Sequence, residues 1–128
     1  MPPGSHVLAI GSLAGVRGAA GAAAYAAAKG ALLGFARDAA GRWGARGICV
    51  NALLPGVLAT DMTAAGQTRA AQELARENVL GAPAAPEDIA AFAVHLCGVR
   101  HVSSQMFALD SRIWPDGAQR VAGETNER

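Results

Sequence analysis

The stretch ICVNALLPG, residues 48–56, decides the fold. It is apolar throughout except for Asn51, and it closes on Pro55-Gly56. A short, continuous apolar run that ends at turn residues is typical of a strand buried on both faces, and such strands occur in parallel sheets covered by helices. The stretch therefore predicts a buried strand of an α/β protein.

Working outward, the chain offers two more strands. Residues 6–10 form a short apolar run that ends at Gly11-Ser12, and residues 105–110 form a third run near the end of the chain. Helices are expected between the strands, because long segments rich in Ala, Leu and Arg favour them and Gly or Pro marks their limits. The expected helices span about 22–43, 68–79 and 86–97, and the expected loops span 13–21 and 57–63.

This order of elements predicts the architecture. Strands that alternate with helices favour a parallel sheet with right-handed crossovers. We expect a partial, Rossmann-like, doubly wound sheet of about three strands in residues 1–114, followed by a polar, flexible tail in residues 115–128. The helix at 22–43 is expected to turn these residues inward: Tyr25, Leu32, Leu33, Phe35, Ala36 and Ala39.

Composition excludes several classes of function. The net charge is +1 and aromatic residues make up 5% of the chain, so neither a phosphate-binding surface nor a stacking platform for nucleic acid is indicated. Cys49 and Cys97 lack neighbours at metal-ligand spacing, so we expect two small buried residues and no metal site. The longest apolar tract, residues 19–28, is too short to span a bilayer. With no secretory signal at its start, the chain is expected to be soluble and cytoplasmic.

The candidate chemistry begins with Tyr25 and Lys29, the only tyrosine and the only lysine of the chain. Positions i and i+4 share one face of a helix. Tyrosine is a poor acid or base at neutral pH, and a nearby ammonium favours its ionised form, so such a pair can exchange a proton with an alcohol or carbonyl oxygen. The alternative is a buried tyrosine beside a solvated lysine.

Ser12 adds a third polar group. It follows the first strand, and side chains at the carboxyl end of a parallel strand face the crevice where open α/β sheets bind ligands. There a hydroxyl can polarise a substrate carbonyl. The alternative is a serine that caps a turn.

Taken together, these motifs resemble the classical short-chain dehydrogenases/reductases, and most closely the 3-oxoacyl-carrier-protein reductases and ketoreductases. The resemblance covers residues 4–110 and rests on five stretches: IGS at 10–12, YAAAKG at 25–30, RGICVNALLPG at 46–56, VLATDM at 57–62 and PEDIA at 86–90.

The resemblance implies an NAD(P)-dependent oxidoreductase that reduces a ketone or oxidises a secondary alcohol. It implies that Tyr25 is the catalytic acid/base, that Lys29 assists it and holds the nicotinamide ribose, and that Ser12 positions the substrate oxygen. Cofactor contacts are implied for Pro55, Gly56, Val57, Leu58 and Thr60, and a substrate lid for about 61–82. The family also implies a small-molecule substrate, NADP somewhat ahead of NAD, and a homo-oligomer assembled through the helix at 22–43.

The chain departs from the family in three places. The glycine-rich turn that seats the pyrophosphate is not found, and Gly11, Gly15, Gly18 and Gly21 match the substrate-side loop instead. Ser104 stands where glycine is usual, and Ser111-Arg112 stand where the family often has Gly-Gly. Without the dinucleotide half, the strand at 6–10 is expected to have an open edge, and this chain alone is expected to bind the cofactor weakly or not at all.

Three explanations fit this pattern. The chain is a fragment, or its start was assigned at an internal methionine; it is a catalytically inactive half-protein that acts as an interaction or assembly partner; or a separate chain supplies the dinucleotide half. The residues identify neither the substrate nor the explanation.

Overall fold

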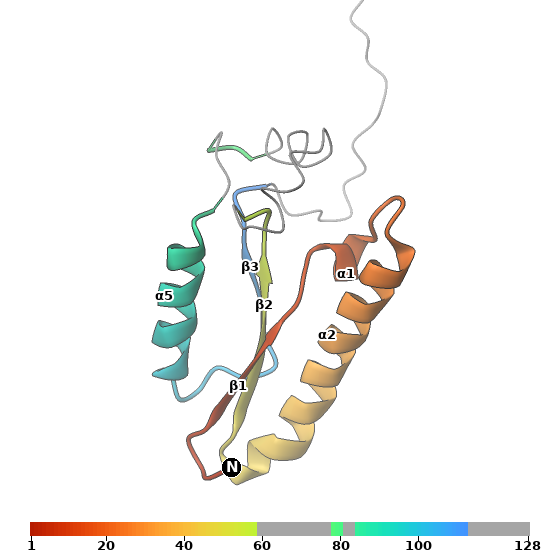
Figure 1. The fold of residues 1–128 in the computed structure, drawn as a ribbon. Helices are drawn as coiled ribbons and strands as arrows, with labels where there is room; N and C mark the ends of the chain where they lie inside the picture. The colour runs from red at the N-terminus through yellow and green to blue at the C-terminus, as the bar shows by residue number, and fades with distance from the viewer. Residues whose placement is uncertain (59–77, 81–83, 113–128) are drawn as a thin grey trace, which may run out of the picture.

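A computed structural model describes residues 1–58, 78–80 and 84–112, and it contains a three-stranded parallel sheet in the order β1-β2-β3. The strands are β1 (His6–Ile10), β2 (Cys49–Pro55) and β3 (Met106–Leu109). Helices connect them and cover both faces of the sheet (Figure 1). The expected partial Rossmann-like architecture is therefore confirmed.

The central strand is β2, which lies within the apolar stretch at residues 48–56. It pairs with β1 in the register His6↔Cys49 to Ile10↔Leu53, and with β3 in the register Ala52↔Met106 to Pro55↔Leu109. Residues 49–54 are all buried. A strand with neighbours on both edges and helices on both faces has no solvent-facing side, which explains why β2 is apolar except for Asn51.

Helix α2 (Ala23–Trp43) confirms the long helix expected at 22–43, and it confirms the predicted inward face in part. Its buried residues are Leu33, Ala36, Ala39 and Ala40, which pack on Ala9, Val50, Ala52 and Leu54 of the sheet. Tyr25 and Phe35, predicted to point inward, are 50% and 52% exposed. Small side chains face the sheet because they let the helix approach it closely, and the aromatic rings lie outside that contact.

The loop expected at 13–21 contains a short helix, α1 (Ala14–Arg17), so that prediction was wrong for these four residues. Leu13, just before α1, is buried at 4% exposure and anchors the turn. After α2 the chain forms a 3-10 turn, η1 (Gly44–Arg46), and reverses at Gly47, whose φ of 69° lies in the left-handed region. Gly47 thus serves as the stop signal that the sequence predicted.

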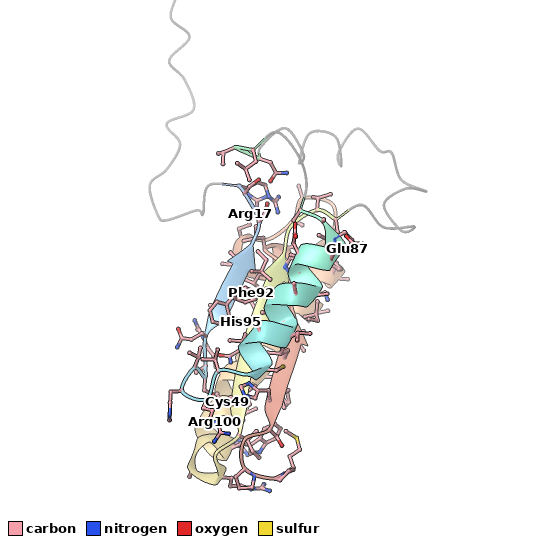
Figure 2. All side chains as sticks on the ribbon, turned by 90° about the vertical axis from the view of Figure 1, so that its left-hand side faces the viewer. Arg17, Cys49, Glu87, Phe92, His95 and Arg100 are labelled. Atoms are coloured by element: carbon pink, nitrogen blue, oxygen red, sulfur yellow. The ribbon has the colours of Figure 1, made fainter. Side chains whose placement is uncertain are left out.

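Helix α5 (Pro86–Cys97) has the predicted bounds, with Pro86 in its first turn. It lies on the face of the sheet opposite α2 (Figure 1). Phe92 extends from α5 toward β3, where its ring meets Phe107 at a centroid distance of 5.3 Å (Figure 2). Cys49 is buried as expected, but Cys97 is exposed, which corrects the expectation for the second cysteine.

Asn51, the polar residue of β2, is fully buried, and its side chain both donates and accepts a hydrogen bond. Its amide nitrogen donates to the carbonyl of Val102 at 2.8 Å, and its side-chain oxygen accepts from the amide of Gln105 at 3.0 Å. A buried amide that satisfies both functions costs little and specifies one arrangement. Asn51 thereby ties the loop before β3 to the central strand.

Three expectations concern residues outside the described ones. These are most of the helix at 68–79, most of the lid at 61–82 and the tail at 115–128. At the end of the expected helix, Asn78 forms a bridge with Arg112 and residues 79 and 80 form a turn. Of the helices in the described part of the chain, none has the length and apolar character needed to cross a bilayer.

Ser104 is the only non-glycine residue with a positive φ in the described ranges, at 63°. The left-handed conformation costs an L-residue about 1–2 kcal/mol, and glycine avoids this cost at some loss of chain entropy. We expect Ser104→Gly to raise the free energy of unfolding by about 0.5–1 kcal/mol, measured by urea denaturation. An unchanged or lowered stability would contradict this.

The neighbouring serine provides the control. The Ser103 hydroxyl accepts a hydrogen bond from the buried Val50 amide at 3.0 Å. Ser103→Gly leaves that amide without its acceptor, so it is expected to lower stability, opposite in sign to Ser104→Gly.

Candidate active site at the carboxyl ends of the strands

Ser12 lies just beyond β1, where the chain turns toward α1. The turn is set by Gly11, whose amide donates to the Leu53 carbonyl at 2.8 Å. A Cβ on Gly11 would lie 2.6 Å from Leu54 Cδ2 and 3.0 Å from Leu33 Cδ2, so this position has no room for a side chain. The Ser12 hydroxyl is half-buried and accepts a hydrogen bond from the Ala14 amide at 3.2 Å. It retains its own proton for donation to a ligand oxygen.

Tyr25 and Lys29 lie in the first two turns of α2, on one face. The Lys29 ammonium is 5.8 Å from the centroid of the Tyr25 ring. At this distance a cation is attracted by the electrons of the ring. Because Tyr25 is half-exposed, its hydroxyl is accessible to a ligand.

The same ammonium ties α2 to the end of β1. Lys29 Nζ donates a hydrogen bond to the backbone carbonyl of Ile10 at 2.9 Å. Ile10 is the last residue of β1, two positions before Ser12. The bond therefore holds the Tyr25–Lys29 face of α2 at the end of the strand that delivers Ser12.

A close helix contact strengthens this arrangement. A Cβ on Gly15 of α1 would lie 2.7 Å from the Lys29 carbonyl carbon and 2.8 Å from the Gly30 amide nitrogen. A Cβ on Gly30 would in turn lie 3.2 Å from the Gly15 oxygen. The two glycines therefore let the α1 and α2 backbones touch beside Lys29, and Ser12 is fixed in the turn that leads into this contact.

The predicted cofactor-facing turn leaves β2 at the same edge of the sheet. Pro55 ends β2, the Gly56 amide donates to the Leu109 carbonyl at 3.2 Å, and Leu58 forms a parallel bridge with Ala84. Residues 55–58 are all half-buried. Thr60, the last predicted contact, lies outside the described residues.

These groups fit one end of a nicotinamide dinucleotide. An accessible phenol, an ammonium and a hydroxyl lie near the carboxyl end of β1, from Tyr25, Lys29 and Ser12. Within the described residues, the glycine-rich turn by which the family seats a pyrophosphate is not found, and in the loop after β1 the space beside Gly15 is filled by the α2 backbone. The nicotinamide-ribose end therefore fits, and the phosphate end is not provided here.

Sequence reasoning missed two features of this edge. One is the Ile10 carbonyl, which accepts the hydrogen bond from Lys29. A backbone acceptor has no signature in the sequence. The other is a buried ion pair between Asp110 and Arg112, which packs against Gly56. Its only signal was the departure noted at Ser111-Arg112, and spacing alone did not show that the arginine turns back onto the aspartate.

The chain is similar in sequence to a known protein family and to several known proteins. The family model described as enoyl-(acyl carrier protein) reductase matches residues 1–111. The 3-oxoacyl-(acyl-carrier-protein) reductase of Salmonella typhimurium is 36% identical over 120 residues, which cover 94% of this chain and 42% of that protein. Carbonyl reductase family member 4 of Danio rerio is 36% identical over 107 residues, covering 84% of this chain and 44% of that protein.

Solved structures of other proteins also superpose on this chain. A blue fluorescent protein from a metagenomic library, in complex with NADPH, superposes with a TM-score of 0.78 at 39% identity and covers 87% of this chain and 46% of that one. A short-chain dehydrogenase of Burkholderia cenocepacia, in complex with NADP, has a TM-score of 0.79 at 27% identity, covering 88% and 46%. The chain thus spans less than half the length of these relatives.

Proposed function

Because the chain belongs to the short-chain dehydrogenase/reductase family and is similar to its 3-oxoacyl-(acyl-carrier-protein) reductases, we propose that it forms the catalytic part of an NAD(P)-dependent oxidoreductase. The proposed reaction is reduction of a ketone to a secondary alcohol, or the reverse. The observation that supports it most is the Lys29 ammonium, held by the Ile10 carbonyl and 5.8 Å from the Tyr25 ring.

Each residue has one role in this proposal. Ser12 donates a hydrogen bond to the substrate oxygen and withdraws electron density from the carbonyl. Tyr25 donates its phenolic proton to that oxygen during reduction and takes it back during oxidation. Lys29 stabilises the resulting phenolate and contacts the ribose of the cofactor. The bound nicotinamide supplies or accepts the hydride at the carbonyl carbon.

The cofactor contacts follow the predicted turn. Backbone groups of Pro55, Gly56, Val57 and Leu58 meet the nicotinamide, and Thr60 adds a hydroxyl. We favour NADP over NAD because the two superposed relatives hold NADPH or NADP. Since the described residues offer no pyrophosphate seat, the rest of the dinucleotide binds to polypeptide beyond them, in the same protein or in a second chain.

The partners are a small ketone or alcohol and further copies of the chain, with no role for nucleic acid or a membrane, and the cytoplasm is the proposed location. Helix α2 suits subunit packing, since Phe35 is 52% exposed and added Cβ atoms on Gly34 and Gly41 would meet nothing within 4 Å. The alternative, an inactive assembly partner, leaves the joint presence of Ser12, Tyr25 and Lys29 without a reason.

A binding experiment tests the proposal. Reduced nicotinamide mononucleotide contains only the part of the cofactor that these residues fit. We expect it to perturb the backbone NMR signals of Tyr25, Lys29, Val57 and Leu58 at roughly millimolar concentration, the affinity range of a few contacts. NADPH should bind this chain alone with a similar affinity, because the described residues offer no seat for its pyrophosphate.

Lys29→Met is expected to abolish these perturbations, whereas Arg37→Met, which removes an exposed charge from the same helix, is expected to preserve them. If neither nucleotide perturbs the signals of the native chain at saturating concentrations, the proposed nicotinamide site is wrong.

A further inference from the structure

A buried ion pair closes the carboxyl end of β3. Arg112 Nε donates to Asp110 Oδ2 at 2.5 Å, a second guanidinium nitrogen contacts the same oxygen, and the Arg112 amide donates to Asp110 Oδ1 at 3.2 Å. The two side chains are only 7% and 4% exposed. Burying two charges carries a desolvation cost that often equals the attraction between them. General stability is therefore a weak explanation for the pair.

The Asp110 carboxylate occupies the place that a side chain at position 56 would take. A Cβ on Gly56 would lie 2.5 Å from Asp110 Cγ and less than 3 Å from both carboxylate oxygens, at 2.7 and 2.8 Å. The Gly56 amide is also bonded to Leu109, the residue before Asp110. The Pro55–Gly56 turn thus rests directly on the ion pair.

Arg112 fixes the pair from its other side. Its backbone forms an antiparallel bridge with Asn78, and the Val79 amide donates to the Ser111 carbonyl at 3.0 Å. Two segments that are distant in sequence, 55–58 and 78–80, therefore meet at residues 110–112. The family often has Gly-Gly at 111–112, and glycine cannot form this ion pair, so the arrangement belongs to this chain's own sequence.

We propose that Asp110 and Arg112 are positioning residues for the Pro55–Leu58 turn. Arg112 orients the Asp110 carboxylate, and the carboxylate fixes the position of Gly56 relative to β3. The turn is thereby held where its backbone can meet the nicotinamide. The last step rests on the proposed function. The earlier steps concern only the free chain.

The test uses two readouts, one of which needs no cofactor. Arg112→Met removes the charge and retains much of the side-chain length. In the free chain, we expect hydrogen exchange of the Gly56 amide to rise about tenfold more than that of the Ala52 amide, which lies in β2 and is bonded to Gln105. The affinity for reduced nicotinamide mononucleotide should fall by about tenfold.

Controls come from the exposed ion pair of α2, Asp38–Arg42, whose Arg and Asp side chains are 73% and 59% exposed. Arg42→Met should change neither readout. If Arg112→Met does not fold, the double variant Asp110→Asn/Arg112→Met replaces both charges, so neither is left buried alone. It is expected to show the same selective loss of protection from hydrogen exchange at the Gly56 amide.

The outcomes separate the two ideas. Equal acceleration at Gly56 and Ala52 means that the pair stabilises the whole fold, and it overturns the inference. Selective acceleration at Gly56 with unchanged nucleotide affinity overturns the role in cofactor positioning. If the native chain binds no nucleotide, the proposed function fails and the cofactor step fails with it, while hydrogen exchange still decides whether the ion pair holds the turn.

Discussion

Tyr25→Phe is expected to lower kcat for ketone reduction by ~10²–10⁴-fold, the usual contribution of a positioned general acid. The substitution removes one oxygen atom from a half-exposed side chain, so neither the fold nor the 5.8 Å approach of Lys29 to the ring should change. The loss therefore belongs to proton transfer, about 3–5 kcal/mol of barrier. Oxidation of reduced nicotinamide, measured by absorbance with a panel of ketones, gives the rate.

This measurement belongs on the assembled enzyme, in which the phosphate end of the cofactor has its seat. Phe35→Leu is the matched control, because Phe35 is the other half-exposed aromatic residue of α2 and lies more than two turns from Tyr25. It should leave kcat within about twofold of the native value, as expected for a residue outside the reacting groups. A Tyr25→Phe enzyme as active as the native one would remove Tyr25 from the mechanism.

Gly15→Ala is expected to destabilise the chain by about 1–3 kcal/mol, the usual cost of forcing atoms into a packed contact. Three backbone atoms of Lys29 and Gly30 lie within 2.9 Å of the added Cβ, and none can rotate away as a side chain could. Helix α1 must therefore move from α2, and Ser12 moves with it. Urea denaturation measures the first effect, and nucleotide affinity measures the second.

Gly34→Ala provides a control of opposite sign. Gly34 lies in the middle of α2, and nothing lies within 4 Å of an added Cβ. Alanine there should stabilise the chain by about 0.5–1 kcal/mol through helix propensity alone. If both alanine variants changed stability in the same direction, the α1–α2 contact would not be what requires glycine at position 15.

The strands and the two long helices could be predicted because each leaves a local pattern in the sequence. Residues 48–54 are apolar except for Asn51, and Pro86 with two following acids opens α5 where expected. The inner face of α2 was predicted only in part. Leu33, Ala36 and Ala39 face the sheet as expected. Hydropathy also favoured Tyr25 and Phe35, but both side chains are half-exposed and lie outside the close contact with the sheet. Size outweighed hydropathy there.

The candidate site likewise has features that the sequence predicted and features that it could not predict. The residue types and spacing of Ser12, Tyr25 and Lys29 were visible in the sequence, as was the turn at Pro55-Gly56. The contacts that position them involve backbone atoms of residues distant in sequence: the Ile10 carbonyl for Lys29, and the Lys29–Gly30 peptide for Gly15. Every residue has such atoms, so these pairings become visible only once the chain is folded.

The parallel sheet also sets how this chain can reach its native state. The ladders join His6 to Cys49 and Ala52 to Met106, so a long stretch of chain separates the two strands of each pair. Ordering such distant pairs requires closing large loops before any ladder forms, which makes folding slow. During synthesis on the ribosome, β1 cannot pair until α2 and β2 have emerged. The apolar β2 cannot pair on its other edge until β3 has emerged. Over these intervals unpaired strands are open to aggregation, so synthesis at reduced temperature or with a chaperone should raise the yield of folded chain.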